Sequence, residues 1–284
     1  MLAKALDGVI SQVTASEFSY EVVVVDNDRR RLAEDTALRF QSTNELKIIY
    51  DCEPEQNIAL ARNRAIQSAT GNFIAFMDDD EFPDEEWLLN LYKTYDIFNA
   101  DGVLGPVKPH FETDPPQWII KSKLCERSSF ETGTILKNSR YTRTGNVLLS
   151  RDVFHGQESP FDPHFGLSGG EDTDFFKRKI EKGFVFVWCN EACVYETIPP
   201  ERQTRTYFVN RAFLRGMTTV EHVSFISFDT IKSIIAVLLY TPALPFLYIA
   251  GQHLFIKYLT KDCDHLGKLL AYCGLKVVKK RLEQ

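Results

Sequence analysis

The chain has 284 residues, of which 44% are hydrophobic and 25% are charged, with 12 prolines and 15 glycines. This composition is that of a globular protein with one large α/β domain or two smaller ones, and it excludes disordered, collagen-like and coiled-coil chains. Thirty-three basic against 39 acidic residues give a net charge of −6. A general nucleic-acid-binding surface is therefore not expected, since it needs many cations to neutralise phosphates. One local basic pocket for a phosphorylated small molecule is compatible with this charge.

Cysteine usage and the N-terminal segment both predict a cytoplasmic location. The six cysteines are scattered, and only Cys189 and Cys193 lie near one another, at a spacing that differs from the CxxC of zinc and redox sites. Reduced thiols in a cytosolic protein are expected. Residues 1–14 are amphipathic and lack the unbroken apolar stretch of a signal peptide.

The first two-thirds of the chain alternate predicted helices and strands. The valine-rich run at 20–25 is typical of a strand buried on both faces. This alternation is the pattern of a doubly wound sheet. In chain order, the sequence predicts a helix over 2–13, a strand over 20–25, a helix over 29–42, a strand over 46–50, a helix over 58–68, a strand over 72–77 and a helix over 84–98.

Beyond residue 102 the alternation loosens. The proline-rich stretch 106–116 predicts a surface loop. Further strands are predicted over 103–107, 145–150 and 184–188, and a further helix over 171–182.

The C-terminal part contains an apolar stretch at 233–250, close to the length of a membrane span. Pro242 and Pro245 lie in its middle, and each removes a backbone donor. Two interpretations have equal support. One is a broken pair of hydrophobic helices packed on the core. The other is a membrane-seated hairpin followed by a basic end at 276–281. For this hairpin, monotopic seating is favoured over a full span of the membrane.

Consecutive acidic residues, Asp78, Asp79, Asp80 and Glu81, directly follow a predicted buried strand. In an open α/β sheet, ligands bind beyond the carboxyl ends of the strands. Adjacent carboxylates repel one another unless a cation neutralises them, and their hard oxygens suit Mg²⁺ or Mn²⁺. An acidic turn that caps the next helix is the alternative, but the preceding strand and the other motifs favour a metal.

Two further groups of polar residues follow the same logic. Asp26 and Asp28 end another predicted strand and suit hydrogen bonds from a base or ribose, although Asp and Asn also build ordinary turns. Arg62, on the helix between the two acidic turns, suits a phosphate or a carboxylate, with a solvated helix arginine as the alternative.

A third acidic group, in the segment 168–174, combines two glycines with the start of a helix. Glu171, Asp172 and Asp174 follow Gly169 and Gly170. A carboxylate at this position suits a general base acting on a hydroxyl. Helix capping by acids at the positive end of the dipole is the alternative, above all for Asp174.

Taken together, these segments resemble family 2 glycosyltransferases with the GT-A fold, a doubly wound mixed sheet. The resemblance covers about residues 1–216, which we expect to form this domain, with 217–284 as a helical tail. Two later stretches, GPVKPHFETDPPQWI and VYETIPPERQT, are closest to bacterial exopolysaccharide enzymes of the succinoglycan type. The segments that carry the resemblance are VVVVDND, NIALARNRAI, GNFIAFMDDDEFPDEEWL, TGNVLLSRDVF and GGEDTDFFKRKIEKG.

The resemblance implies metal-dependent transfer of a sugar, with inversion, from a nucleotide-sugar donor, with UDP favoured, to a saccharide or lipid-linked saccharide. Asp172 matches the catalytic base, with Glu171 beside it, and Asp80 matches the ligand of Mn²⁺ or Mg²⁺. The acceptor side would include Gly145, Asn146 and Gly170. The residues implied in donor binding are Asp26, Asp28, Arg62, Asp78 and Asp79.

Two departures from the family are visible. The usual first strand, of the type VSVIIPTYNR, has no counterpart, and its loss is expected to leave a gap beside residues 22–25. The QxxRW motif of processive synthases is also absent after Gln203, which favours a single addition. The alternatives are an inactive nucleotide-sugar-binding or scaffold protein, and a nucleotidyltransferase. The expected location is cytoplasmic, peripheral or monotopic at the inner face of the membrane, where the hydrophobic tail would bring the active site to a lipid-linked acceptor.

Overall fold

The computed structural model describes residues 1–166, 169–219 and 228–275. The chain divides into two compact units, the first made of 1–110 and 127–197 and the second of 111–126 and 198–284. The boundary predicted after residue 216 falls inside a helix of the second unit, α7 (Arg205–Thr219).

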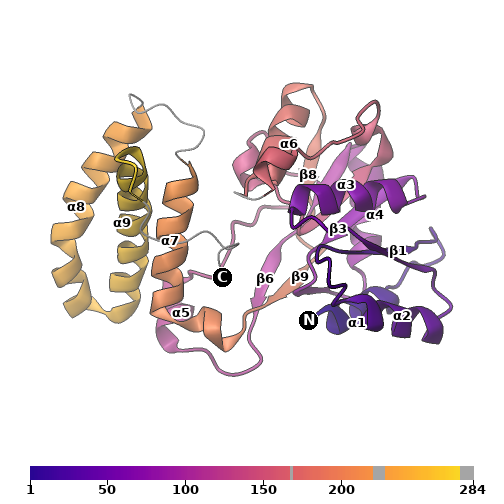
Figure 1. Cartoon of the computed structure of the whole chain (residues 1–284), viewed down its shortest axis with the longest axis horizontal. Coiled ribbons are helices and arrows are strands. Elements are labelled where there is room, and N and C mark those ends of the chain that lie inside the picture. The colour runs from indigo at the N-terminus through magenta and orange to yellow at the C-terminus, as the bar shows by residue number, and fades with distance from the viewer. Residues whose placement is uncertain (167–168, 220–227, 276–284) are drawn as a thin grey trace. The chain divides into compact units, whose positions relative to one another are not determined.

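The first unit has the mixed α/β fold that the sequence predicts (Figure 1). Its strands are β1 (Val22–Asp26), β2 (Ile48–Cys52), β3 (Phe73–Met77), β4 (Glu81–Pro83), β5 (Gly102–Leu104), β6 (Val107–His110), β7 (Asn146–Ser150), β8 (Phe186–Trp188) and β9 (Val194–Thr197). Its helices are α1 (Leu2–Ile10), α2 (Glu34–Thr43), α3 (Ile58–Ser68), α4 (Trp87–Phe98), α6 (Glu171–Glu181) and the short 3₁₀ turns η1 (Ser139–Tyr141), η2 (Arg151–Phe154) and η3 (Pro163–Phe165).

These strands form three sheets. β1 and β2 pair in parallel, and β3, β7, β5 and β8 form a mixed sheet in that order. The third sheet has the order β4, β9, β6. Because β3 and β7 are antiparallel, with Met77 opposite Asn146, the end of β3 lies beside the start of β7. This register brings the acidic turn after β3 next to Gly145.

The structure corrects three expectations for the strands. The strand predicted over 103–107 is divided between β5 and β6, and β6 lies inside the stretch expected to be a loop. β4 and β9, three and four residues long, were not predicted, because so short a run carries no readable alternation. The expectation that 20–25 is buried on both faces is also wrong, since Val22 to Val25 are only half-buried. Within the described residues β1 pairs with β2 alone, so its other edge lacks the cover that a central strand has.

The position of α6 is set by an aromatic cluster. Phe175 and Phe176, in its second turn, are fully buried. The Phe175 ring stacks on Phe161 with the centroids 4.5 Å apart, and Phe176 meets Phe186 of β8 edge to face at 5.0 Å. Large aromatic rings dominate the energetics of such a core. The N-terminus of α6, with its acidic residues, is thereby anchored against the sheet.

The start of α3 is fixed by the side chain of Asn57, which is buried. Its Oδ1 accepts hydrogen bonds from the amides of Ala59 at 3.0 Å and Leu60 at 3.3 Å. Its Nδ2 donates to the carbonyl of Pro163 at 2.9 Å. A Cβ at Gly166 would lie 1.6 Å from Asn57 Oδ1, so this position requires glycine. One side chain therefore caps α3 and ties it to the segment before α6.

Replacing this cap tests its energetic role. We expect Asn57→Ala to lower the free energy of unfolding by about 2 kcal/mol, because the helix loses its cap and Pro163 loses a buried donor. The matched control is Asn138→Ala, since Asn138 caps η1 at an exposed position, with Oδ1 3.0 Å from the Arg140 amide. Its cost should be about 1 kcal/mol or less. Equal costs in denaturant titrations would contradict this role for Asn57.

The second unit is helical. In Figure 1, α7, α8 and α9 run side by side, and α9 packs against both of the others. The close approach of α7 and α9 requires glycine, since a Cβ at Gly216 would lie 2.1 Å from the carbonyl oxygen of Asp264. Arg215 of α7 forms an ion pair with Asp264 at 2.8 Å. The elements of the second unit are α5 (Gln117–Ser122), η4 (Pro200–Gln203), α7, α8 (Phe228–Ala250) and α9 (Gln252–Tyr272).

The apolar stretch is one continuous helix, so the broken pair, one of the two interpretations, is wrong. α8 has 23 residues, with Pro242 and Pro245 inside it, and the chain turns at Gly251 instead. The carbonyls of Leu238 and Thr241, four residues before the prolines, lose their helical donors, and both residues are exposed. By length and composition α8 is the one helix among the described residues that could span a membrane, and little of it is buried. The basic end at 276–281 lies outside the described residues.

Candidate active site

The centre of the candidate site is Arg62, on α3. Its side chain is largely buried and forms an ion pair with Glu171, the first residue of α6. A second nitrogen of the same guanidinium lies 3.5 Å from Asp78 Oδ1, beyond the end of β3. Arg62 therefore joins two acidic motifs that are far apart in the sequence. The predicted alternative of a solvated helix arginine is wrong, because the neighbouring acids draw this side chain into the protein.

Glu171 and Asp172 have different surroundings, although they are neighbours in the chain. Glu171 is buried, and this burial raises the pKa of its carboxyl, as does the charge of Asp172, while Arg62 opposes the shift. Asp172 is partly exposed, and its Oδ1 accepts hydrogen bonds from the amide and hydroxyl of Thr173. Asp174 forms an ion pair with Arg178 at 2.8 Å. Of these acids, Asp172 is the one at the helix start without a cation partner among the described residues.

The two glycines before α6 are required by their backbone conformation. Gly169 has φ +83° and Gly170 has φ +101°, in the left-handed region that favours glycine. Within the described residues nothing lies within 4 Å of a Cβ added at either position, so space is not the constraint. Ser168, which precedes them in the motif, lies outside the described residues.

The acidic turn after β3 faces Gly145. The Asp78 side chain is 44% exposed, and a Cβ at Gly145 would lie 3.1 Å from its Oδ2. Asp79 is exposed, and the backbone carbonyl of Asp80 accepts a hydrogen bond from Thr197 of β9 at 2.9 Å. Glycine at 145 therefore leaves room beside the carboxylates at the carboxyl end of β3.

Glu81 completes the acidic turn, and sequence reasoning gave it no separate role. Its side chain is 1% exposed, and its Oε2 accepts the Asp78 amide hydrogen at 3.2 Å. Arg127 Nη1 lies 3.9 Å from Glu81 Oε1, while Nη2 of the same arginine contacts Glu196 at 2.5 Å. Nothing in the sequence pattern indicated Arg127, because strand pairing between β4 and β9 assembles this group.

Burial raises the pKa of Glu81 from 4.5 to about 9, and the charge of Asp78 adds to the shift, while Arg127 opposes it. Between these two pH values the folded chain binds more protons at this site than the unfolded chain does. Stability from Glu81 is therefore complete below pH 4.5 and is lost as the pH rises toward 9.

Glu81→Gln should remove this loss, because the amide oxygen still accepts the Asp78 amide hydrogen but carries no charge. With EDTA present, we expect the thermal midpoint of the variant to exceed that of the wild type by about 3 °C or more at pH 8.5, and by much less at pH 5. Glu85→Gln, at an exposed position, is the control. A constant difference across this pH range would contradict a protonated Glu81 in the folded state.

The turn after β1 is stabilised by the side chains of its own acidic residues. Asp26 is buried and accepts hydrogen bonds from the amides of Asp28 at 3.1 Å and Ala33 at 2.7 Å. Tyr50 also donates to Asp26, at 3.3 Å, and Asp28 forms an ion pair with Arg30 at 2.6 Å. In this structure both carboxylates therefore stabilise the turn, the role that was the alternative to base recognition.

Asn146, predicted on the acceptor side, has its side-chain hydrogen bonds inside the protein. Its Oδ1 accepts from the Trp87 indole at 2.8 Å, and its Nδ2 donates to the carbonyls of Pro106 and Ala192. Among the described residues no group of three or more His, Cys, Asp or Glu side chains is arranged to hold a metal ion by itself.

Comparison with known proteins decides the family. The sequence model described as glycosyl transferase family 2 matches residues 1–156, more than half of the chain. The chain belongs to this family. The succinoglycan biosynthesis protein ExoM of Rhizobium meliloti is 32% identical over 220 residues, which are 76% of this chain and 69% of that protein. Glycosyltransferase AglE of Haloferax volcanii is 27% identical, over 67% of this chain and 60% of that protein.

Solved structures agree on the fold of this family 2 glycosyltransferase. A crystal structure of S. aureus TarS has a TM-score of 0.51 at 15% identity, covering 97% of this chain and 88% of that chain. TarS in complex with UDP-GlcNAc has a TM-score of 0.54 at 16% identity, covering 97% of this chain and 89% of that chain. At such low identity the likeness shows the fold alone. The GT-A fold and the family predicted from the sequence motifs are confirmed.

Proposed function

We propose that this family 2 glycosyltransferase moves a sugar, with inversion, from a nucleotide-sugar donor to a saccharide acceptor in the synthesis of a cell-surface polysaccharide. The observation that carries the proposal is the bridge from Arg62 to both Asp78 and Glu171. Because Arg62 joins the acidic turn after β3 to the start of α6, it supports a single site built from both motifs. The succinoglycan protein ExoM and the UDP-GlcNAc complex of TarS support a polysaccharide product and a UDP-sugar donor.

Donor binding is assigned to the ends of β1 and β3. Asp78 would approach the ribose, with Asp79 beside it, and Arg62 would hold Asp78 in place. Asp26 and Asp28 would face the base while they keep their loop in shape.

The acidic turn fits a divalent cation, because it presents hard oxygen ligands beside the space that Gly145 leaves. Asp80 would hold Mn²⁺ or Mg²⁺ together with Asp78. Such an ion stabilises the negative charge that develops on the leaving diphosphate.

The reaction is a single displacement in which Asp172 acts as the base. The acceptor oxygen attacks the anomeric carbon from the face opposite the diphosphate, and its proton passes to the Asp172 carboxylate. The bond from the anomeric carbon to the phosphate oxygen breaks, and its electron pair leaves with the nucleoside diphosphate. Glu171, buried against Arg62, would hold the start of α6 so that Asp172 keeps its position. Gly170 gives the backbone its turn at this point.

The second unit would seat the enzyme on the cytoplasmic face of a membrane, peripherally or as a monotopic protein, near a lipid-linked acceptor. α8 carries large apolar side chains that are more than half exposed in this chain. Such a helix binds a membrane surface through its buried apolar area. These side chains are Phe228, Ile231, Ile235, Leu238, Leu239, Phe246, Tyr248 and Ile249.

The base is tested with Asp172→Asn, which removes the proton acceptor but keeps the size of the side chain. We expect release of UDP from UDP-sugars, in the presence of a lipid-linked saccharide extract, to fall about 10³-fold. UDP binding should change little. Asp174→Asn, in the same helical turn, is the control and should keep turnover within about threefold, since Asp174 pairs with Arg178. Unchanged turnover in Asp172→Asn would contradict this role.

The metal site is tested by calorimetric titration of UDP with and without Mn²⁺. The wild type should bind UDP more tightly with Mn²⁺, and Asp80→Ala should lose that gain, about tenfold or more. Asp35→Ala, at the start of α2, is the control and should behave as the wild type. Equal gains from Mn²⁺ in the wild type and Asp80→Ala would contradict the assignment of Asp80.

A further inference from the structure

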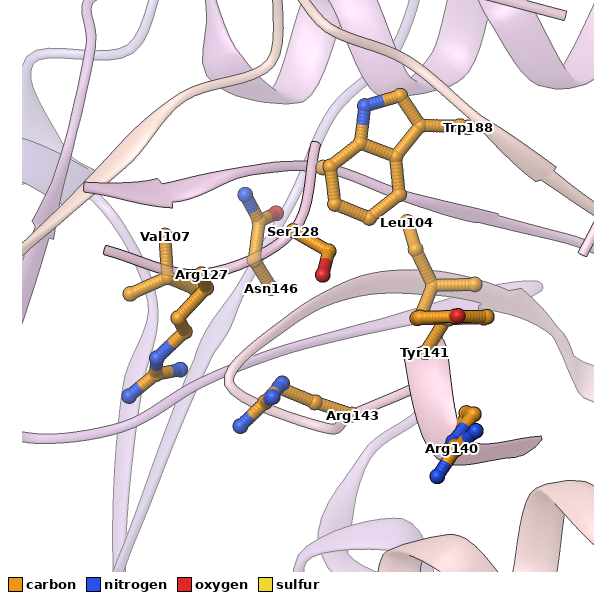
Figure 2. A pocket seen from close by; sticks show the side chains of 10 residues that line it. Leu104, Val107, Arg127, Ser128, Arg140, Tyr141, Arg143, Asn146 and Trp188 are labelled. Atoms are coloured by element: carbon orange, nitrogen blue, oxygen red, sulfur yellow. The ribbon is translucent and has the colours of Figure 1, made fainter. Parts of the chain in front are cut away.

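A pocket of about 90 Å³ opens to solvent on the first unit, beside the start of β7. Its wall comes from six parts of the chain: the end of β5, the start of β6, the segment at 127–128, the loop around η1, the start of β7 and the end of β8. In the view of Figure 2, the side chains of Arg127, Arg140 and Arg143 lie along one side, and Trp188 lies on the other. None of the ten residues that line this pocket is acidic.

Three arginines line this pocket, although the whole chain carries a net charge of −6. Arg127 forms an ion pair with Glu196, in which Nη2 lies 2.5 Å from Oε2. Arg140 and Arg143 are exposed, and among the described residues the Arg140 guanidinium has a contact only with the ring of Tyr141, 5.9 Å from its centroid. Arginine presents a planar set of donors that matches carboxylate and phosphate groups in pairs.

An aromatic wall stands beside these charges. Phe130 joins Tyr141 and Trp188, with ring centroids 5.2 Å and 5.3 Å away and edge-to-face geometry. Tyr141 is 39% exposed, whereas Trp188 is buried except where it lines the pocket. Apolar surface with a few convergent polar groups is the usual lining of a small-molecule site.

The pocket adjoins the candidate active site but differs from its donor side. Gly145 faces the carboxylates of Asp78 and Glu81, whereas the next residue, Asn146, lines the pocket. Arg127 also connects the two, since it lines the pocket and lies 3.9 Å from Glu81. An anion in this pocket would therefore lie next to the site without contacting the acidic turn, where a donor diphosphate would need a metal.

We propose that this pocket binds a negatively charged group of the acceptor, a carboxylate or a phosphate, through Arg140, Arg143 and Arg127, with the adjoining sugar ring against Tyr141. The inference rests on the proposed function and adds the substrate class: an acidic saccharide, or a saccharide carried on a lipid diphosphate. These two sources share the chemistry of an oxyanion, and different probes separate them.

The experiment titrates the full chain, saturated with UDP and Mn²⁺, with three probes by calorimetry. Methyl β-glucuronide carries a carboxylate, methyl β-glucoside is its neutral counterpart, and geranyl diphosphate represents a lipid diphosphate. We expect at least one anionic probe to bind about tenfold or more tightly than the glucoside. Tighter binding of the glucuronide identifies an acidic saccharide, and tighter binding of geranyl diphosphate identifies a lipid diphosphate. If neither anion binds better than the glucoside, the proposal is overturned.

Variants of Arg140 and Arg143 test whether the anionic probe binds in this pocket. Arg140→Gln combined with Arg143→Gln should weaken the anionic probe about tenfold, whereas Arg39→Gln, an exposed arginine of α2, should leave it within about twofold. Arg140→Lys combined with Arg143→Lys keeps the charge and should retain part of the binding. Equal affinity in the glutamine double variant and the wild type would overturn the proposal.

Failure of the proposed function is visible separately in the UDP titration. If UDP does not bind even with Mn²⁺, the donor site fails, while the probes still report on the pocket in its absence. If UDP binds and competes with the anionic probe, the pocket belongs to the donor site and the acceptor assignment is overturned. The double variant should bind UDP as the wild type does, because Arg140 and Arg143 lie outside the acidic turn.

Discussion

The candidate site depends on a single buried cation, Arg62, shared by two acids. A charge removed from water is tolerated only where partners compensate it, and here Glu171 and Asp78 do so from different elements. The ion pair fixes the distance between the end of β3 and the start of α6. Its own position depends on α3, whose first turn is held by Asn57. A cap, a helix and an ion pair thus form one chain of contacts.

A second group of charges balances the other side of the acidic turn. Glu81 is enclosed between Asp78 and Arg127, and Arg127 is drawn mainly toward Glu196. Arg62 and Arg127 therefore compensate the negative charges of the buried and half-buried acids in this region. Repulsion among the consecutive aspartates favours a cation from outside, and the space beside Gly145 allows one to approach.

The second unit has a different physical basis. α7 and α9 approach each other closely because glycines at 216 and 267 leave no side chain between them. α8 packs on α9 but keeps much of its apolar surface exposed, and its two prolines lie on that exposed side. A helix with this distribution gains little from burial within its own unit. It gains more where an apolar medium covers its outer face, which is the basis of the proposed seat on a membrane.

Local patterns in the sequence were enough for most of the longer helices and strands of the first unit. The α3 range of 58–68 agrees with the predicted helix to the residue, and in the structure Asn57 caps its first turn. The β3 strand and the acidic turn after it were equally clear, since a buried apolar run ends abruptly in carboxylates. The family followed from such motifs in order.

What the sequence by itself determined, then, was the alternation of elements, the family and the set of acidic motifs. Tertiary structure alone decided which side chains meet: Arg62 with Glu171, Arg127 with Glu81, and the three arginines around one pocket. It also decided that α8 continues through its prolines. The physical reason is that such contacts join residues far apart in the chain, whereas propensity, periodicity and capping act only over a few neighbouring residues.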